Sequence, residues 1–124
     1  MARSQGEHEG RVERPSKKNE YVVEFATRDA QKGWRDLCST TGNAMADAWD
    51  YLTKTPDASR APHGPLKGDY ATLTRDGNAY QRWQYEVPGG ARIWYWIVPS
   101  DARKRVQGRV LLERVFTHHP NQTK

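Results

Sequence analysis

Residues 80–98, YQRWQYEVPGGARIWYWIV, contain the pattern that determines the fold class. Two runs rich in aromatic and β-branched residues, 80–87 and 91–98, lie on either side of Pro88-Gly89-Gly90. Runs of this composition separated by a short Gly/Pro turn are typical of a β-hairpin. We therefore expect two neighbouring strands here, and further strands on both sides of them.

The segments around this hairpin continue the strand pattern. Residues 70–74 run into Asp76-Gly77, a dipeptide that favours a tight turn between strands. After a polar loop at residues 99–108, residues 109–117 alternate again and predict the last strand. The second half of the chain therefore predicts four strands in succession.

The first half predicts one strand followed by two helices. Residues 21–26 are β-rich, Thr27 can cap a helix, and a loop occupies residues 57–65. Apolar residues at spacings of three and four predict helices containing Ala30, Trp34, Leu37 and Cys38, then Met45, Ala48, Trp49 and Leu52. The order β-α-α-β-β-β-β predicts an α+β domain in which an antiparallel sheet packs against an N-terminal helical hairpin.

Length and composition are those of one small domain with a tail. Residues 1–19 lack periodicity and are rich in Gly, Glu, Arg, Lys and Ser, so we expect a disordered basic arm before a domain at 20–124. Apolar residues make up 35 % of the 124, and the mean hydropathy is −1.01. Five Trp and six Tyr must therefore supply much of the core.

The sequence also predicts a cytoplasmic location. The longest apolar run, residues 93–98, is far shorter than the roughly 20 residues of a membrane span. Residues 1–20 are polar, so we expect no cleavable signal and no membrane partner. The single Cys38 cannot form an internal disulfide.

Positive charge is concentrated in the second half of the chain. The net charge is +5, and residues 60–124 hold eleven Lys and Arg against five acids, whereas residues 20–59 hold four against seven. A basic half favours a polyanionic partner, nucleic acid before membrane, because no basic amphipathic helix accompanies it. The alternative is a soluble surface that is basic without a binding role.

Strand alternation divides the side chains between two faces of the sheet. If the turn at 88–90 has an odd loop length, Trp83, Tyr85, Val87, Ile93, Tyr95 and Ile97 share the face under the helices. The other face then receives Arg82, Gln84, Glu86, Arg92, Trp94 and Trp96, and Arg114, Phe116 and His118 share one side of the last strand. Guanidinium groups and aromatic rings on one exposed face suit single-stranded RNA. Taken individually, an indole such as Trp94 or Trp96 is more often part of the core, and an arginine such as Arg82 or Arg92 is usually a solvated charge.

Three motifs, in sequence order, resemble the RelE/ParE toxins of bacterial toxin–antitoxin pairs. They are Leu66-Lys67-Gly68, the strand opening Arg92-Ile93-Trp94-Tyr95, and the last strand ending in His118-His119-Pro120. The resemblance covers residues 20–124. It implies a cognate protein antitoxin as partner, and a cofactor-free, metal-independent endoribonuclease that cleaves mRNA in association with the ribosome.

The resemblance also implies roles for single residues. In such chemistry the ribose 2′-oxygen attacks the adjacent phosphate, which requires a base, an acid and cations for the phosphorane. Arg92 matches the strand arginine that would clamp the phosphate, and His118 or His119 is the expected acid/base. Glu86 is a possible base or a partner for Arg92 across the strands. The expected RNA-binding residues are Lys67, Arg82, Trp94, Trp96, Arg114 and Lys124.

Departures from the pattern leave alternatives open. Gln84 and Glu86 occupy the stretch where RelE has lysines, and the terminal tyrosine-type residue is missing. A ParE-like inhibitor of DNA gyrase without nuclease activity, and an RNA-binding module without catalysis, are the alternative functions. A metal site at His118-His119 is disfavoured, because adjacent residues of a strand point to opposite faces.

Overall fold

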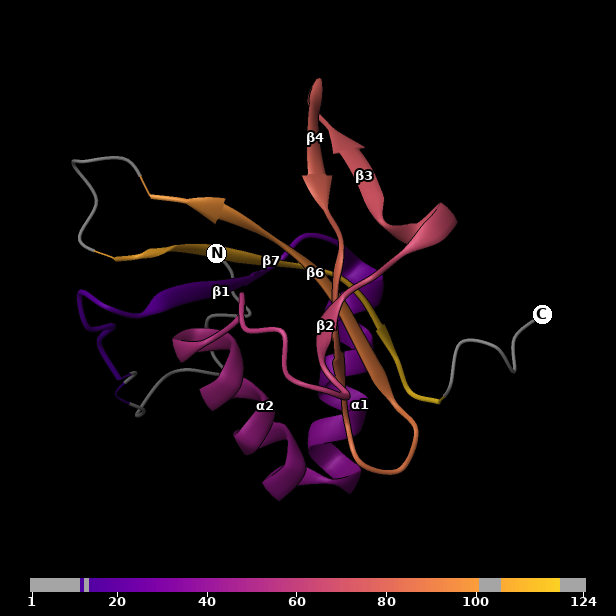
Figure 1. Ribbon diagram of the computed structural model, residues 1–124. Coiled ribbons are helices and arrows are strands. Elements are labelled where there is room, and N and C mark those ends of the chain that lie inside the picture. The colour runs from indigo at the N-terminus through magenta and orange to yellow at the C-terminus, as the bar shows by residue number, and fades with distance from the viewer. Residues whose placement is uncertain (1–11, 13, 101–105, 119–124) are drawn as a thin grey trace.

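The computed structural model describes residues 12, 14–100 and 106–118. Its elements are β1 (Tyr21–Phe25), α1 (Arg28–Thr40), α2 (Gly42–Lys54), β2 (Gly64–Pro65), a 3₁₀ turn η2 (Gly68–Tyr70), β3 (Thr72–Arg75), β4 (Asn78–Gln81), β5 (Trp83–Glu86), β6 (Arg92–Pro99) and β7 (Gly108–Phe116). Figure 1 shows the two helices beside each other, with the β3–β4 hairpin rising away from them. The α+β class and the strand-helix-helix-strands order are confirmed.

The main sheet has five strands in the order β1-β7-β6-β5-β2. Its neighbours are antiparallel except β1 and β7, which run parallel from Tyr21 opposite Gly108 to Phe25 opposite Leu112. The expectation of a wholly antiparallel sheet is therefore wrong for this pair. Two parallel strands need a crossover connection, and the helices and strands between β1 and β7 supply it.

Two further differences concern the segments around Arg82. The expected loop at 57–65 contains the short strand β2, in which Gly64 pairs with Gln84. The expected strand at 80–87 is divided at Arg82, whose backbone N–H donates to the carbonyl of Ala71 at 2.7 Å. As a result β3 and β4 form a separate two-stranded sheet, joined by the expected Asp76-Gly77 turn with both residues at positive φ.

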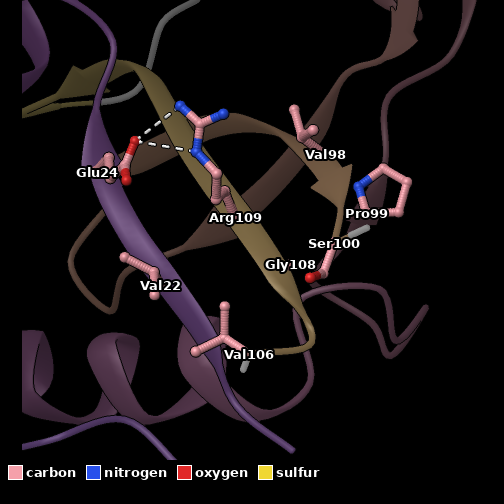
Figure 2. A pocket seen from close by; sticks show the side chains of 8 residues that line it. All are labelled: Val22, Glu24, Val98, Pro99, Ser100, Val106, Gly108 and Arg109. Carbon is pink, nitrogen blue, oxygen red and sulfur yellow. Dashed lines mark hydrogen bonds and ion pairs between the residues drawn. The ribbon is translucent and has the colours of Figure 1, made fainter. Parts of the chain in front are cut away.

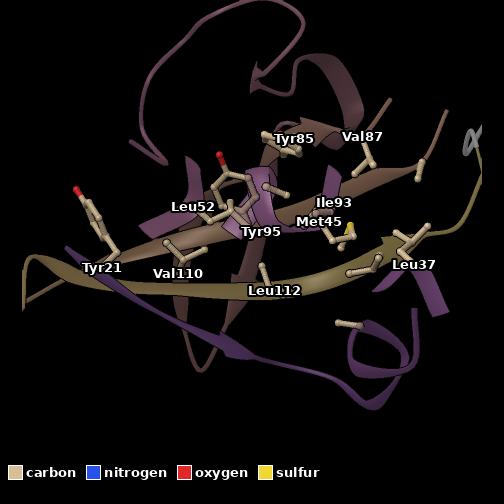
Figure 3. Close-up of a cluster of buried hydrophobic side chains, with 14 residues drawn as sticks. Tyr21, Leu37, Met45, Leu52, Tyr85, Val87, Ile93, Tyr95, Val110 and Leu112 are labelled. Carbon is tan, nitrogen blue, oxygen red and sulfur yellow. The ribbon is translucent and has the colours of Figure 1, made fainter. Parts of the chain in front are cut away.

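The helical hairpin is stabilised by a cap at its start and by apolar residues that pack on the sheet. Thr27 caps α1, since its Oγ1 accepts from the Ala30 N–H at 3.0 Å. Gly33 allows α1 to approach β7 closely, because a Cβ there would lie 2.4 Å from the carbonyl oxygen of Val115. The helices cover the expected face of the sheet, and Tyr95, at the centre of this core, is fully buried and donates its hydroxyl to the carbonyl of Pro56 at 2.6 Å (Figure 3).

The second face of the sheet is also partly covered, which the sequence did not predict. A smaller cluster joins Leu73 of β3 to Trp96 and Leu111 of the main sheet, with Tyr80 of β4 packed against it. The β3–β4 hairpin therefore lies over the second half of β6 and the first half of β7 rather than extending the main sheet. This arrangement decides which of the expected binding residues are accessible.

Candidate functional site

Arg92 and Glu86 form an ion pair at the start of β6. The two residues are paired across β5 and β6, and Nη2 of Arg92 lies 2.8 Å from Oε2 of Glu86. Nη1 of Arg92 donates to the carbonyls of Gly90 at 3.1 Å and Ala91 at 3.3 Å. The guanidinium is therefore held in one orientation at the hairpin end, with its side chain 10 % exposed.

The two histidines expected to supply acid/base chemistry follow β7. His118 is exposed, and its Nδ1 lies 3.3 Å from the Thr117 hydroxyl. Arg92 pairs with Phe116, so Phe116 is on the Arg92 side of the sheet, and His118 lies two residues beyond it in a bend after β7. Within the described part of the chain no contact joins His118 to Arg92, whose partners lie on β5 and in the hairpin turn. His119 and Lys124 lie outside the described residues.

Arg82 is held by a second ion pair on this face. Its Nε and Nη2 lie 2.7 and 2.8 Å from the two carboxylate oxygens of Glu113, and Nη1 donates to the carbonyl of Tyr70. Both charged side chains are about 15 % exposed, and the guanidinium lies over the Trp94 ring. Glu113 can take this place because it is a bulge residue without a partner on β6, between the pairs Tyr95–Leu112 and Trp94–Arg114.

The indoles of Trp94 and Trp96 are buried, so the expectation that they are exposed is wrong. Their residues are 8 % and 4 % exposed. Tyr70 and Phe116 pack against Trp94, and Tyr80 against Trp96. The physical reason is the β3–β4 hairpin with the turn η2, which removes from water aromatic surface that the main sheet alone would expose. A base could stack on these rings only after the covering side chains moved.

Arg114 and Lys67 are the expected RNA-binding residues that are exposed in the described chain. Arg114 pairs with Trp94 across the strands, and its guanidinium lies 4.9 Å from the Phe116 ring centroid. Lys67 lies between η2 and β2, the edge strand of the main sheet. The predicted site residues that the structure describes are thus of two kinds. Some are exposed (Lys67, Arg114, His118), and the others are held by contacts within the domain (Arg82, Glu86, Arg92, Trp94, Trp96).

Two residues near this surface were missed by the sequence analysis. Tyr70 is 54 % exposed and covers Trp94. The sequence placed Tyr70 in a strand and gave no sign of this contact. His63 is half-buried beside β5, and burial lowers its pKa. Its position between Pro62 and Gly64-Pro65 resembled a loop, and nothing local showed that the loop pairs with β5.

A separate cavity of about 410 Å³ lies at the other end of the sheet, between β1, β7 and the end of β6. Figure 2 shows Val22, Val98 and Val106 around it, with Arg109 ion-paired to Glu24 at 2.9 Å. None of the candidate residues that the structure describes lines it. The described residues also contain no cluster of three or more potential metal ligands and no helix long and apolar enough to cross a membrane.

Comparisons with known proteins show a similarity in structure rather than in sequence. No family model matches the sequence, and no curated protein matches it significantly. Among solved structures, the chain is similar to a YoeB/ParE toxin from Agrobacterium tumefaciens, with a TM-score of 0.55 and 18 % sequence identity. The match covers 79 % of this chain and 99 % of the other. Together with the element order and the core described above, it shows that this chain has the fold of the RelE/ParE toxins.

Proposed function

We propose that the chain is the toxin of a toxin–antitoxin pair and that it cleaves mRNA in the cytoplasm without a metal ion. The similar YoeB/ParE structure supports the toxin assignment through the shared fold. The single observation that supports RNA cleavage is the guanidinium of Arg92, held by Glu86 and by two carbonyls at the hairpin end. A cation fixed in advance stabilises a phosphorane better than a mobile one, because little reorganisation is needed during reaction.

The proposed reaction forms a bond from the ribose 2′-oxygen to phosphorus and breaks the bond to the 5′-oxygen. Arg92 stabilises the negative charge on the phosphorane, and exposed Arg114 on the same face binds a neighbouring phosphate. His118, with His119 as the alternative, accepts the proton of the 2′-hydroxyl and then protonates the departing 5′-oxygen. Glu86 acts as a positioning residue for Arg92, because its carboxylate is already occupied by the guanidinium.

The proposed partners follow from this reaction. The substrate is mRNA, presented on the ribosome, and the inhibitor is an antitoxin that covers the face carrying Arg92 and Arg114. The ion pairs of Arg82 and Arg92 give the gyrase-inhibitor alternative its support, because both charges are already neutralised within the domain. The experiment must therefore separate cleavage of RNA from poisoning of gyrase.

The test is expression of the chain in bacteria, with growth and the 5′ ends of cellular mRNA both measured. We expect growth arrest with new mRNA ends, and we expect Arg92→Ala and His118→Ala each to reduce cleavage by roughly 10²-fold or more, the usual effect of removing one such group. Glu86→Gln should reduce it less than Arg92→Ala. Arg109→Gln, at the opposite end of the β6–β7 pair from Arg92, is the matched control and should cleave normally.

Intact mRNA in arrested cells that accumulate gyrase–DNA cleavage complexes would replace this proposal with the inhibitor. Normal mRNA cleavage by Arg92→Ala or His118→Ala, with the variant folded by circular dichroism, would remove that residue from the mechanism. RNA binding without growth arrest or cleavage would favour a binding module.

A further inference from the structure

His63 lies just before β2 and has no role in the proposed mechanism. It is a titratable side chain that neighbouring groups hold in place. Its ring stacks on Tyr85 with 4.0 Å between centroids and 3° between planes, and the Tyr51 ring lies 4.9 Å away. The backbone is held as well, because Arg60 and His63 exchange two N–H to carbonyl hydrogen bonds at 3.0 and 2.8 Å. The imidazole is therefore held in one orientation.

The hydrogen bonds of this ring determine where its proton lies. Nδ1 accepts from the backbone N–H of Glu86 at 3.0 Å. A peptide N–H can only donate, so Nδ1 carries the lone pair and the hydrogen of the neutral ring is on Nε2. Burial lowers the pKa of His63; the Arg60 charge acts in the same direction and the Glu86 charge opposes it. The ring is thus neutral near pH 7, and its basic nitrogen is already occupied.

The second nitrogen is the one free to act. Nε2–H has no acceptor among the described residues, and it points away from β5 because Nδ1 faces it. The charged groups that act on the ring are Arg60 and Glu86. Glu86 is neutralised by Arg92 at 2.8 Å, which leaves the positive charge of Arg60 beside a fixed neutral donor. This combination suits an anionic oxygen.

We propose that His63 is an RNA-contacting residue, whose Nε2–H donates to a phosphate oxygen of the bound strand away from the cleaved linkage, with Arg60 contributing charge beside it. The inference rests on the proposed function, because it takes RNA as the ligand. The His63 ring packs against Tyr85 and Tyr51 on the helix side of the sheet, next to the edge strand β2. Its Nδ1 binds the backbone of the same Glu86 whose carboxylate holds Arg92 on the opposite face, so an RNA strand that contacts both must pass around this edge. His63 contributes as a neutral donor and Arg60 as a cation, and this difference can be measured.

The experiment measures binding of a short, labelled single-stranded RNA whose 2′-oxygens are methylated, so that it cannot be cleaved. Affinities are measured over a range of salt concentrations at two pH values above neutrality. We expect His63→Phe, which keeps a flat ring against Tyr85, to weaken binding by about 3- to 10-fold, the usual range for one neutral hydrogen bond. Its salt dependence should stay unchanged. Arg60→Gln should lower the slope of log K against log salt by about 0.7, the value for one phosphate contact of a single strand.

Two further variants make the result interpretable. His63→Gln retains an acceptor and a donor on one side chain, and it should recover part of the lost affinity. Arg109→Gln, on β7, which β6 and β5 separate from β2, should keep the wild-type affinity apart from a general effect of net charge. Thermal unfolding of each variant separates a loss of binding from a loss of fold.

Failure of this inference is distinguishable from failure of the proposed function. If wild-type protein neither binds nor cleaves RNA, both proposals are overturned. If the wild type cleaves RNA but His63→Phe, folded, binds as tightly as the wild type, only the role of His63 is overturned. A lower salt slope in His63→Phe would also overturn it, because the ring would then bind as a cation.

Discussion

At the scale of single residues, one buried carboxylate holds the segment that precedes β1. Glu20 is 3 % exposed and accepts two hydrogen bonds from the guanidinium of Arg14, at 2.9 and 2.6 Å, and one from the Lys17 N–H at 2.8 Å. Arg14 also lies over the Trp49 ring of α2. Part of the sequence expected to be a disordered arm is thus in contact with the domain, whereas residues 1–11 and 13 lie outside the described residues.

This carboxylate should make the domain sensitive to acid. The Arg14 hydrogen bonds, followed by the Lys17 N–H, lower the pKa of Glu20 to about 2. The pKa in the unfolded chain is near 4.3, so the stabilisation is complete above that value and is lost as the pH falls toward about 2. Arg14→Gln should raise the folded-state pKa and flatten this dependence. Urea unfolding midpoints measured across this pH window test it.

The control is Arg109→Gln, which breaks an exposed ion pair with Glu24 and should leave the acid dependence unchanged. If Arg14→Gln unfolds with the same pH dependence as the wild type, the carboxylate of Glu20 does not contribute in the way described.

For the candidate site, the sequence predicted which face of the sheet a side chain occupies, but not whether that side chain is free or ion-paired. Alternation correctly brought Glu86, Arg92 and Trp94 to the same face, because the side-chain period of a strand is local. Whether Arg82 is free or neutralised depends on Glu113, which is 31 residues away in the chain. No local pattern contains that information.

At the scale of elements, the β3–β4 hairpin has the largest consequence for the site. Its turn was predictable, because Asp76-Gly77 adopts the positive φ angles of a tight turn. Its docking was not, because that depends on contacts between Leu73 and Tyr80 and residues of β6 and β7. The hairpin covers Trp96, and Tyr70 of η2 with Phe116 of β7 covers Trp94, so both expected RNA-stacking rings are buried.

The hairpin should therefore contribute measurably to stability. Leu73 is 7 % exposed and packs in the cluster with Trp96, so Leu73→Ala should lower the free energy of unfolding by roughly 2–5 kcal/mol. Thr74→Ala, on the exposed side of the same strand, is the matched control and should change it by less than about 0.5 kcal/mol. Chemical unfolding of both variants is the measurement. Equal stabilities would mean that the hairpin does not pack on the sheet as described.

At the scale of the whole molecule, the two ends of the domain meet in one strand pair. β1 is the first strand and β7 the last, and β1 brings Tyr21 and Val23 to the core beneath the helices. The charge of the molecule is also divided between its two halves. Residues 20–59, which form β1 and the helices, are net acidic, and residues 60–124 are net basic. We therefore expect a polyanion to be attracted to residues 60–124 rather than to the helices.

Because β1 closes the sheet at the edge, its loss should prevent folding. We expect a chain that begins at Thr27 to show no cooperative thermal transition, since it lacks the partner of β7 and part of the core. A chain lacking only residues 1–11 keeps the Arg14–Glu20 contact and should unfold cooperatively. Circular dichroism during heating distinguishes the two. Cooperative unfolding of the shorter chain would show that β1 is dispensable.

The sequence by itself determined the α+β class, the order of the elements and the two faces of the β5–β6 hairpin, because these follow from residue spacing and turn chemistry within a few residues. The tertiary structure decided the parallel pairing of β1 with β7, the covering of Trp94 and Trp96, and the bulge at Glu113. That bulge allows Leu112 to face the helices while Arg114 faces Trp94, which strict alternation forbids. Such features depend on contacts between residues far apart in the chain, and local patterns do not encode them.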